Sequence, residues 1–579
     1  MIILGINAYH GDASAAIIAD GKLIAAAEEE RFNRIKHSAG FPGQAVRYCL
    51  KEAGVAPDKI DYVAVPRQPC ARIIKKIYYG IKVPRLAARR YTALKMTRGI
   101  KADLAGSLGM DEKLIRARFV NIEHHRAHLA SSFFVSPFDK ALVFSADGLG
   151  DFASTMWGIG EGNKLKITGD ICFPYSLGLY YTAITQYLGF PAYGDEYKVM
   201  GLAAYGEPEY RDEFKEIVFE HGDLGFKLGL DYFLHHKKLV DMNFEEGYPS
   251  LEPLYSGYLE ARLGPARKSP SPIERKHYNI AASLQGRLEE IIFGMLNGLS
   301  GRINLKDICM SGGVAFNCVA NGKILSNTGF RDVYIPPAAG DAGLAIGGAF
   351  YLWYHLLNNP RSFTMEHAYW GPAYKAEDVS RALESQGNAL NKEGCKITRI
   401  SDEDQLCRSA AKAIAEAKVV GWFQGRMEWG PRALGNRSIF VDPRRKEMKD
   451  LLNSRVKHRE PFRPFAPSVL EERTSEYFEG GNYSPFMLFA YKVRPEKKEL
   501  IPAVTHVDDT ARVQTVSRRD NPLFWQLISE FDKLTGVPVL LNTSFNDNEP
   551  VVNSPREAVE CFLRTKMDIL VMENFFIEK

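Results

Sequence analysis

Two histidines in the run EHHRAH at 123–128 are the clearest candidates for chemistry. The run continues into LASSFF, which predicts a helix, and residues i and i+4 of a helix lie on one face. His124 and His128 can therefore bind one ion, while His125 points about 100° away. Neutral imidazoles at this spacing suit a first-row divalent metal. The spacing alone, however, is more typical of two surface histidines.

Two aspartates strengthen the metal hypothesis. Asp147 ends the strand expected after that helix, and Asp341 opens the helix expected after the loop IPPAAG. Both lie beside glycines, where a backbone can approach a phosphate closely. A site of two histidines and two aspartates fits iron(II), manganese or zinc, and the residue types do not choose among them. Calcium or magnesium alone fits two imidazoles less well.

Cations gather in a second region of the chain. The segment GPRALGNRS at 430–438 carries two arginines around a turn of small residues, and KHREPFRP at 457–464 adds three more cations. Prolines and aromatic residues favour an extended backbone here, and such clusters bind oxyanions. Arg512 and the segment NTSFN at 542–546 are candidates to complete this pocket. A network of salt bridges between domains is the alternative.

The elements that must position these residues follow from the hydrophobic pattern. The first 27 residues predict three strands, the last two joined by a hairpin at Asp20-Gly21. A strand, an acidic glycine-rich turn and a strand recur at 141–157, which is a faint internal repeat. Between 306 and 355, two strand–loop–helix units present backbone N–H groups to an anion. Ordinary βα units are the alternative, but the combination favours a nucleotide site.

A chain of 579 residues is too long for one hydrophobic core. The segment NNPRS at 358–362 is typical of a linker, with a second domain running from there to Lys579. The whole chain has 45% apolar residues, 25% charged residues and a net charge of +4. These values are ordinary for a soluble protein and do not favour binding to nucleic acid or membrane. We expect no secretory signal and no transmembrane segment. The eight cysteines lack CxxC spacing and indicate reduced thiols in a cytoplasmic protein.

One segment departs from this ordinary composition. Residues 67–101 contain eleven Lys or Arg and no acid, with aromatic and aliphatic residues interleaved. A solvated helical face is the default interpretation. The alternatives are an element that binds a substrate, such as the acceptor of a transferred group, or an element that binds an anionic surface.

Several motifs together carry a resemblance to a known family. They are HGDASAA (10–16), EHHRAH (123–128), DGLGD (147–151), DEYKVMGLAAYGEP (195–208), SGGVAFN (311–317), GDAG (340–343), WGPRALGNRSI (429–439) and FRPFAPSV (462–469). Through them the chain resembles, over nearly its whole length, the NodU/CmcH-type O-carbamoyltransferases, which carbamoylate antibiotics and nodulation factors.

The resemblance implies an α/β fold with two domains. Residues 1–358 would form an actin/Hsp70-like (ASKHA) ATPase-superfold domain that binds a metal and transfers the carbamoyl group. Residues 363–579 would form a YrdC-like α/β domain that makes carbamoyl adenylate from carbamoyl phosphate and ATP. The acceptor would be a hydroxyl of a small molecule such as a natural product or a sugar.

The resemblance also assigns roles to individual residues. The metal ligands would be His124, His128, Asp147 and Asp341. Carbamoyl phosphate would contact Arg432, Lys457 and Arg463, and ATP or the adenylate would contact Arg512 and Ser544. In the N-terminal domain the nucleotide would be bordered by Gly312, Gly313 and Asn317. His10 would polarise or deprotonate the acceptor hydroxyl, with Arg432 and Lys457 as the other catalytic residues.

The expected cofactors and partners follow from these roles. They are ATP as a substrate with magnesium, a divalent metal for which iron(II) is favoured over manganese or zinc, carbamoyl phosphate and a hydroxyl acceptor. No nucleic acid is expected; the oligomeric state is left open, with a homodimer as one option. Segment 207–275 carries no signature, and Lys198 is a candidate to line the acceptor site, with a structural role as the alternative.

Three rival functions remain open. The first is carbamoyl or threonylcarbamoyl transfer to a protein or tRNA, although the chain lacks the acylphosphatase module and CxxC zinc fingers of hydrogenase maturation. The second is a kinase or chaperone-like ATPase on the same superfold. The third is a non-catalytic protein that binds anionic surfaces or nucleic acid through 67–101, which would leave the other motifs without a purpose.

Overall fold

The computed structural model describes residues 1–82, 99–238, 242–243, 249–481 and 483–579. Part of the basic segment, 83–98, thus lies outside the described residues. The chain divides into two compact units, Met1–Met365 and Glu366–Lys579. No helix among the described residues is long and apolar enough to cross a membrane.

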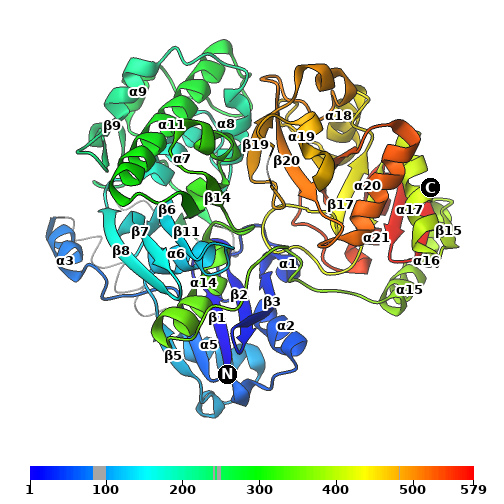
Figure 1. Ribbon diagram of the computed structural model, residues 1–579, viewed down its shortest axis with the longest axis horizontal. Helices are drawn as coiled ribbons and strands as arrows, with labels where there is room; N and C mark the ends of the chain where they lie inside the picture. Colours follow the sequence, from blue (N-terminus) through cyan, green and yellow to red (C-terminus); the bar gives the residue numbers. More distant parts are fainter. Residues whose placement is uncertain (83–98, 239–241, 244–248, 482) are drawn as a thin grey trace. The chain divides into compact units, whose positions relative to one another are not determined.

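The first sheet of the N-terminal unit has the order β3-β2-β1-β4-β5 (Figure 1). Its strands are β1 (Ile2–Asn7), β2 (Ser14–Ala19), β3 (Lys22–Glu28), β4 (Tyr62–Val65) and β5 (Arg118–Asn121). The first three pair antiparallel, and β4 and β5 are added in parallel. The expected hairpin is confirmed, with Asp20 and Gly21 both at positive φ between β2 and β3.

The second sheet of this unit repeats the plan. Its order is β14-β13-β6-β7-β8, with three antiparallel strands followed by two parallel ones. The strands are β6 (Lys140–Gly150), β7 (Ala153–Glu161), β8 (Lys164–Cys172), β13 (Asp307–Ser311) and β14 (Asp332–Tyr334). The faint repeat at 141–157 is thus the start of a duplicated sheet.

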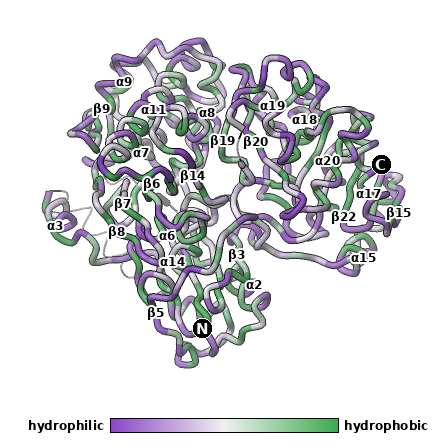
Figure 2. The backbone as a smooth tube through the Cα atoms, in the orientation of Figure 1, coloured by the Kyte–Doolittle hydropathy of each residue, from purple (hydrophilic) through white to green (hydrophobic). Residues whose placement is uncertain are grey.

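Two helices form the layer between the sheets. α6 (His124–Phe133) packs on β6 and β13, and α14 (Leu344–Phe350) packs on α6 and on β1 and β2. Apolar residues along both sheets supply the core of this layer (Figure 2). This duplicated plan confirms the α/β class and the actin/Hsp70-like N-terminal unit.

The remaining elements of this unit surround that core. The helices are α1 (Glu30–Asn33), α2 (Gly43–Ala53), α3 (Ile73–Lys82), α5 (Ile100–Leu108), α7 (Leu177–Tyr187), α8 (Glu196–Ala203), α9 (Arg211–Ile217), α10 (Gly257–Leu263), α11 (Arg275–Ile303), α12 (Cys318–Asn321) and α13 (Ile324–Asn327). Two short hairpins are β9 (Val218–Glu220) with β10 (Phe226–Leu228), and β11 (Met242–Asn243) with β12 (Ser250–Leu251).

The expected linker at 358–362 belongs to the N-terminal unit. Arg361 donates hydrogen bonds to the carbonyl oxygens of Ser136 and Phe138, at 2.7 and 2.5 Å. The backbone N–H of Met365 donates to the carbonyl of Val135. The division between the units therefore falls after Met365 instead of at the proline-containing segment.

The C-terminal unit is built on one nine-stranded mixed sheet of order β15-β23-β22-β16-β17-β21-β18-β20-β19. Its strands are β15 (Lys396–Arg399), β16 (Val420–Phe423), β17 (Arg437–Val441), β18 (Ala466–Leu470), β19 (Phe489–Lys492), β20 (Thr510–Val516), β21 (Val539–Ser544), β22 (Ile569–Met572) and β23 (Phe575–Glu578). The helices are α15 (Ala376–Ser385), α16 (Gly387–Lys392), α17 (Glu403–Ala415), α18 (Glu447–Leu452), α19 (Thr474–Tyr477), α20 (Pro522–Thr535) and α21 (Pro555–Arg564). β16 and β21 lie near the middle of this sheet, on either side of β17.

Candidate functional site

Helix α6 brings His124 and His128 together at the core of the N-terminal unit. Their Nε2 atoms lie 3.1 Å apart, and the side chains are 1% and 0% exposed. Asp147 Oδ2 lies 3.3 Å from His124 Nε2 and 3.5 Å from His128 Nε2. Asp341 Oδ1 lies 3.5 and 3.4 Å from the same two atoms. The four residues expected to bind a metal therefore converge on one point.

Close backbone packing holds the helix in this place. A Cβ at Gly347 of α14 would overlap the carbonyl oxygen of Ala127, and a Cβ at Gly150 of β6 would overlap the ring of His124. The carboxylate of Asp151 accepts a 2.9 Å hydrogen bond from the backbone N–H of His124. This bond satisfies a donor of the first helical turn, and the negative charge suits a helix N-terminus.

The geometry of this quartet fits a first-row divalent metal. Metal–ligand bonds of about 2.1 Å in a tetrahedral site place the ligand atoms about 3.4 Å apart. The five distances between the imidazole nitrogens and from them to the carboxylate oxygens run from 3.1 to 3.5 Å. Asp341 Oδ1 is buried and faces both imidazoles without a well-formed hydrogen bond to any described residue. A cation would satisfy that atom.

The pKa values of the four residues also favour a positive charge at this site. Burial and the neighbouring Asp147 carboxylate raise the pKa of Asp341. Burial acts against ionisation of Asp147 too, but hydrogen bonds with both histidines hold its pKa well below the usual value. Burial lowers the pKa of His128, yet Asp147 and Asp341 outweigh it and raise that pKa to about 9. Two neighbouring, largely enclosed carboxylates thus favour a positive charge beside them, from protons or from a metal.

His125 has a different role on the same helix. Its Nδ1 lies 2.9 Å from the hydroxyl of Ser145 on β6, so the ring faces the sheet and not the quartet. Burial and the two neighbouring histidines hold its pKa well below the usual value. The expectation that His125 points away from the ion is therefore confirmed.

His10 lies beside the quartet. Its ring centroid is 5.5 Å from that of His124, and its Nε2 is buried. Burial, followed by the nearby Arg67 guanidinium, holds the pKa of His10 well below the usual value, so the imidazole is neutral. A neutral imidazole is able to accept a proton.

A second cluster near His10 was not singled out from the sequence. His37 Nδ1 lies 2.7 Å from Asp12 Oδ1, and the backbone N–H of His37 donates to Glu30. The ring of Tyr193 meets His37 edge-on at 5.3 Å. Tyr193 is protonated, because burial and nearby carboxylates, Asp341 among them, raise its pKa well above the usual value. Asp12 belongs to the quoted motif HGDASAA, whereas no sequence signal marked Tyr193.

The expected nucleotide residues of the N-terminal unit follow β13. Gly312 has φ 88°, and a Cβ there would overlap the backbone of Ala146. The N–H of Gly313 donates to Asp147 Oδ1 at 2.8 Å, so this donor supports a member of the quartet. Asn317 exchanges hydrogen bonds with the amide of Gln285 and accepts one from the N–H of Ala320. Their nucleotide contacts stay a prediction.

Lys198 lies on α8, close to the second cluster in sequence. Its ammonium pairs with Asp195 at 2.8 Å and lies 5.6 Å from the ring centroid of Phe190. These contacts give Lys198 a structural role in the described unit. Its contact with an acceptor stays a prediction.

In the C-terminal unit, Lys457 and Ser544 are in direct contact. The buried ammonium of Lys457 donates to the carbonyl and hydroxyl of Ser544, at 2.5 and 3.3 Å. It also donates to the carbonyl and side-chain oxygens of Asn546, at 2.8 and 2.7 Å. Lys457 therefore fixes the end of β21.

Arg512 shares a sheet face with Ser544. Gln514 Oε1 accepts hydrogen bonds from Ser468 and from the amide of Asn542, so these side chains lie on one face. Side chains alternate along a strand, which puts Arg512 on the face of Gln514 and Ser544 on the face of Asn542. The carbonyls of Ala433 and Leu434 accept from Asn542 and Gln514, so the loop that carries Arg432 covers this face.

The two arginines of that loop differ. Arg437 is fully buried, donates to the carbonyls of Gln424, Gly425, Pro372 and Asn436, and lies over the ring of Phe423. Burial lowers its pKa to about 10. Arg437 is thus part of the frame, whereas Arg432 is partly exposed. Arg463 lies 3.5 Å from Glu460 on the neighbouring segment.

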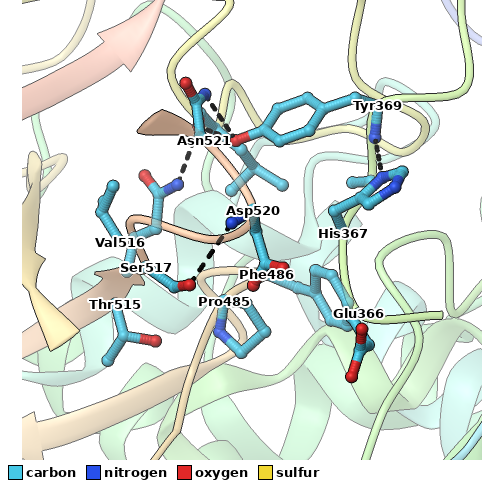
Figure 3. Close-up of a pocket in the computed structure, with 13 residues that line it drawn as sticks. Glu366, His367, Tyr369, Pro485, Phe486, Thr515, Val516, Ser517, Asp520 and Asn521 are labelled. Carbon is cyan, nitrogen blue, oxygen red and sulfur yellow. Dashed lines mark hydrogen bonds between the residues drawn. The ribbon is translucent and has the colours of Figure 1, made fainter. Parts of the chain in front are cut away.

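A small pocket lies beside this loop (Figure 3). Tyr369, Leu434, Gln514 and Asn521 are among its lining residues. Asn521 donates to the hydroxyl of Tyr369, which in turn donates to the carbonyl of Leu434. None of the five residues expected to bind carbamoyl phosphate or ATP lines it. The hydrogen-bonded chain from Asn521 through Tyr369 therefore holds Leu434 of the loop in place.

Comparison with known proteins gives matches to both units. A family model described as "Carbamoyltransferase N-terminus" matches residues 2–350, and one described as "Carbamoyltransferase C-terminus" matches residues 411–579. The chain is 40% identical to a Synechocystis sp. protein over 100% of its own length and 96% of that protein. It is 39% identical to nodulation protein NolNO of Sinorhizobium fredii, over 99% of its own length and 80% of the relative.

Solved structures are more distant. The structure of HypF from T. kodakarensis is 13% identical, with a TM-score of 0.30, over 62% of this chain and 48% of that one. Similarity at this level does not indicate a shared function.

Proposed function

Because this chain belongs to the carbamoyltransferase family, an enzyme family that transfers carbamoyl groups, we propose a division of the reaction between its units. The C-terminal unit makes carbamoyl adenylate from carbamoyl phosphate and ATP. The N-terminal unit transfers the carbamoyl group to a hydroxyl of a small molecule, such as a natural product or a sugar. The observation that carries this proposal is the convergence of His124, His128, Asp147 and Asp341 beside a neutral His10.

The activation step is supported by the cationic face of the C-terminal sheet. Arg432, Lys457, Arg463 and Arg512 provide charge for the phosphates of carbamoyl phosphate and ATP. Formation of the adenylate from carbamoyl phosphate, ATP and water releases one orthophosphate and one pyrophosphate. Lys457 already contacts four oxygens around Ser544 and Asn546, so a bound phosphate would share its donors.

The transfer step is supported by the state of His10. The oxygen of the acceptor hydroxyl attacks the carbamoyl carbon, and the phosphate oxygen of AMP leaves with the bonding electrons. His10 accepts the hydroxyl proton, because its imidazole is neutral and one ring nitrogen carries a free lone pair. Gly313, through Asp147, links the nucleotide loop to the quartet.

A divalent metal would be held by His124, His128, Asp147 and Asp341, where it would act as a Lewis acid on the carbonyl or the leaving phosphate. Two imidazoles and two carboxylates suit iron(II), which we favour, and also manganese or zinc. Magnesium would accompany ATP at the C-terminal unit.

Two variants of the full chain separate the steps. Arg432→Ala should reduce pyrophosphate release from ATP and carbamoyl phosphate at least 100-fold, because an oxyanion loses its bidentate partner. His128→Ala should keep pyrophosphate release within about threefold of wild type and abolish transfer to an acceptor hydroxyl. Exposed residues of the same types, Arg408 and His221, serve as controls, and their alanine variants should retain both steps. Loss of pyrophosphate release in His128→Ala would contradict the division of labour.

A further inference from the structure

Helix α3 and the residue before it contact the N-terminal unit through one face. Arg72, just before it, donates hydrogen bonds to Glu123 and to Asp170 of β8, at 2.6 Å each. On the helix, the ammonium of Lys75 lies 3.1 Å from Cys172 Sγ. The ring of Tyr79 packs edge-on against Phe152 and Phe173. These contacts define the face of α3 that is attached to the N-terminal unit, at its edge beside β8 (Figure 1).

The opposite face of α3 is apolar and exposed. Its residues fall at helical spacing and form one stripe. They are Ile73 (50% exposed), Ile74 (81%), Ile77 (55%), Tyr78 (52%) and Ile81 (76%). Figure 2 shows hydrophobic and hydrophilic residues interleaved along this helix. A stripe of four isoleucines held outward is unfavourable in water and is typical of an interaction surface.

The charged residues of α3 itself are all lysines, namely Lys75, Lys76 and Lys82. Lys75 and Lys82 are exposed, and the ammonium of Lys82 lies 4.6 Å from the ring centroid of Tyr78. The sequence from 67 to 101 has eleven Lys or Arg and no acid. An apolar stripe flanked by lysines is complementary to a bilayer with anionic head groups, where apolar side chains enter the acyl boundary and cations meet phosphates.

We propose that α3 is a membrane-docking helix that lies in the plane of an anionic bilayer. Ten residues of helix extend about 15 Å, half the thickness of the hydrocarbon core, so α3 lies on the surface instead of spanning it. Ile74, Ile77 and Ile81 enter the lipid, and Lys82, beside Tyr78, binds a head-group phosphate. This assignment goes beyond the proposed transfer reaction and does not depend on it.

Docking at α3 has a structural connection to the transfer site. Arg72 contacts Glu123, the residue immediately before α6. Asp151 Oδ2 accepts from the backbone N–H groups of both Gln68 and His124. The segment that leads into α3 is therefore fixed to the N-terminus of the helix that carries the histidine pair. A docked molecule would work on acceptors at the membrane surface.

Sedimentation with vesicles tests the docking. The full chain should pellet with vesicles of phosphatidylcholine and phosphatidylglycerol at low salt, and at least tenfold less with phosphatidylcholine alone. The double variant Ile74→Glu/Ile81→Glu should bind the anionic vesicles at least tenfold more weakly. Leu114→Glu is the matched control, because Leu114 is 53% exposed on the same unit, and it should bind as wild type.

A fluorescent reporter and a melting curve complete the test. Tyr78→Trp should show a blue-shifted emission only with the anionic vesicles. Because the isoleucines are exposed, the double glutamate variant should melt within about 2 °C of wild type without lipid. Failure of the wild type to pellet, equal binding by the double variant, or a melting point lowered by many degrees would overturn the proposal. The last result would mean that the stripe is covered by protein, within the chain or by a second copy.

Discussion

The histidine pair His124 and His128 is the residue-scale centre of the molecule, because two buried carboxylates face it. Two carboxylates and two neutral imidazoles carry a net charge of about −2 in a site whose histidines are fully buried, which is costly without a counter-charge. Either protons on the imidazoles or one divalent cation can balance it. The raised pKa of His128, about 9, reflects the first option. Metal and protons therefore compete for the same site.

Metal content separates the roles of His128 and His125. His128→Ala removes a ligand, so we expect less than about one tenth of the wild-type metal after dialysis. His125→Asn replaces an equally buried histidine that contacts Ser145, and it should keep at least half of the metal. Elemental analysis of the purified proteins measures both. Equal metal loss in the two variants would assign the effect to damage of α6.

The Asp12–His37 pair predicts a pH-dependent stability. Burial lowers the pKa of His37, but Asp12 and Glu30 outweigh it and raise the pKa to about 9, above its usual value of 6.5. The ion pair therefore adds its full contribution to the free energy of unfolding below about pH 6.5, and this contribution is lost as the pH rises through about 9. Melting of Asp12→Asn should thus differ from wild type by several degrees at pH 6 and by little at pH 9.5.

The control for that titration is a surface aspartate. Asp58→Asn removes an exposed carboxylate that pairs with the exposed Lys59, and its melting curve should follow wild type at both pH values. A difference between Asp12→Asn and wild type that stays constant from pH 6 to 9.5 would show that the ion pair is not its source.

At the residue scale, part of the site could be predicted from the sequence. The i, i+4 spacing of His124 and His128 and the strand-end positions of Asp147 and Asp341 are local patterns. The burial of Arg437 in a cage of carbonyls is not, because Arg432 and Arg437 stand in one loop with the same chemistry. Tyr193 could not be predicted either, because its approach to His37 depends on how distant segments fold together.

At the element scale, the approach of α14 to α6 decides whether the histidines stay in place. A Cβ added at Gly347 would lie 1.9 Å from the carbonyl oxygen of Ala127 on α6. A Cβ added at the neighbouring Gly348 would have no atom closer than 3.6 Å. Gly347→Ala should lower the unfolding free energy by about 1–3 kcal/mol and weaken metal binding, because α6 must shift. Gly348→Ala should leave stability unchanged or raise it by up to about 1 kcal/mol.

Denaturant melts and metal titrations of the two glycine variants provide the comparison. The two changes add the same methyl group to adjacent positions of one helix, so a difference between them reports on the contact with Ala127. Equal stability and equal metal affinity of the two variants would show that α6 tolerates displacement.

Elements with a local signature could be predicted, and those defined by distant pairing could not. The Asp20-Gly21 hairpin and helix α6 follow from turn residues and periodicity. The C-terminal sheet interleaves β17, β21, β18 and β20, an order set by side-chain packing between strands up to a hundred residues apart. The N–H of Gly313 was expected to be available to an anion, but Asp147 occupies it, a contact across 166 residues.

At the scale of the whole molecule, the two units carry different chemistry. The N-terminal unit brings two histidines and two aspartates together between duplicated sheets, and the C-terminal unit has Arg512 and Ser544 on one face of its sheet, with Lys457 in contact with Ser544. Carbamoyl adenylate would hydrolyse in water, so a reaction divided between units requires the intermediate to remain shielded. Family membership establishes carbamoyl transfer. The route through carbamoyl adenylate is our proposal, and it has a direct test.

Analysis of the products of labelled ATP tests that route most directly. We predict that the full chain converts ATP labelled at the α-phosphate to AMP, with one pyrophosphate per turnover, only when carbamoyl phosphate is present. An actin-like kinase or ATPase would release ADP instead. AMP formation that depends on carbamoyl phosphate is the result that the account requires. Formation of ADP, or of AMP without carbamoyl phosphate, would contradict it.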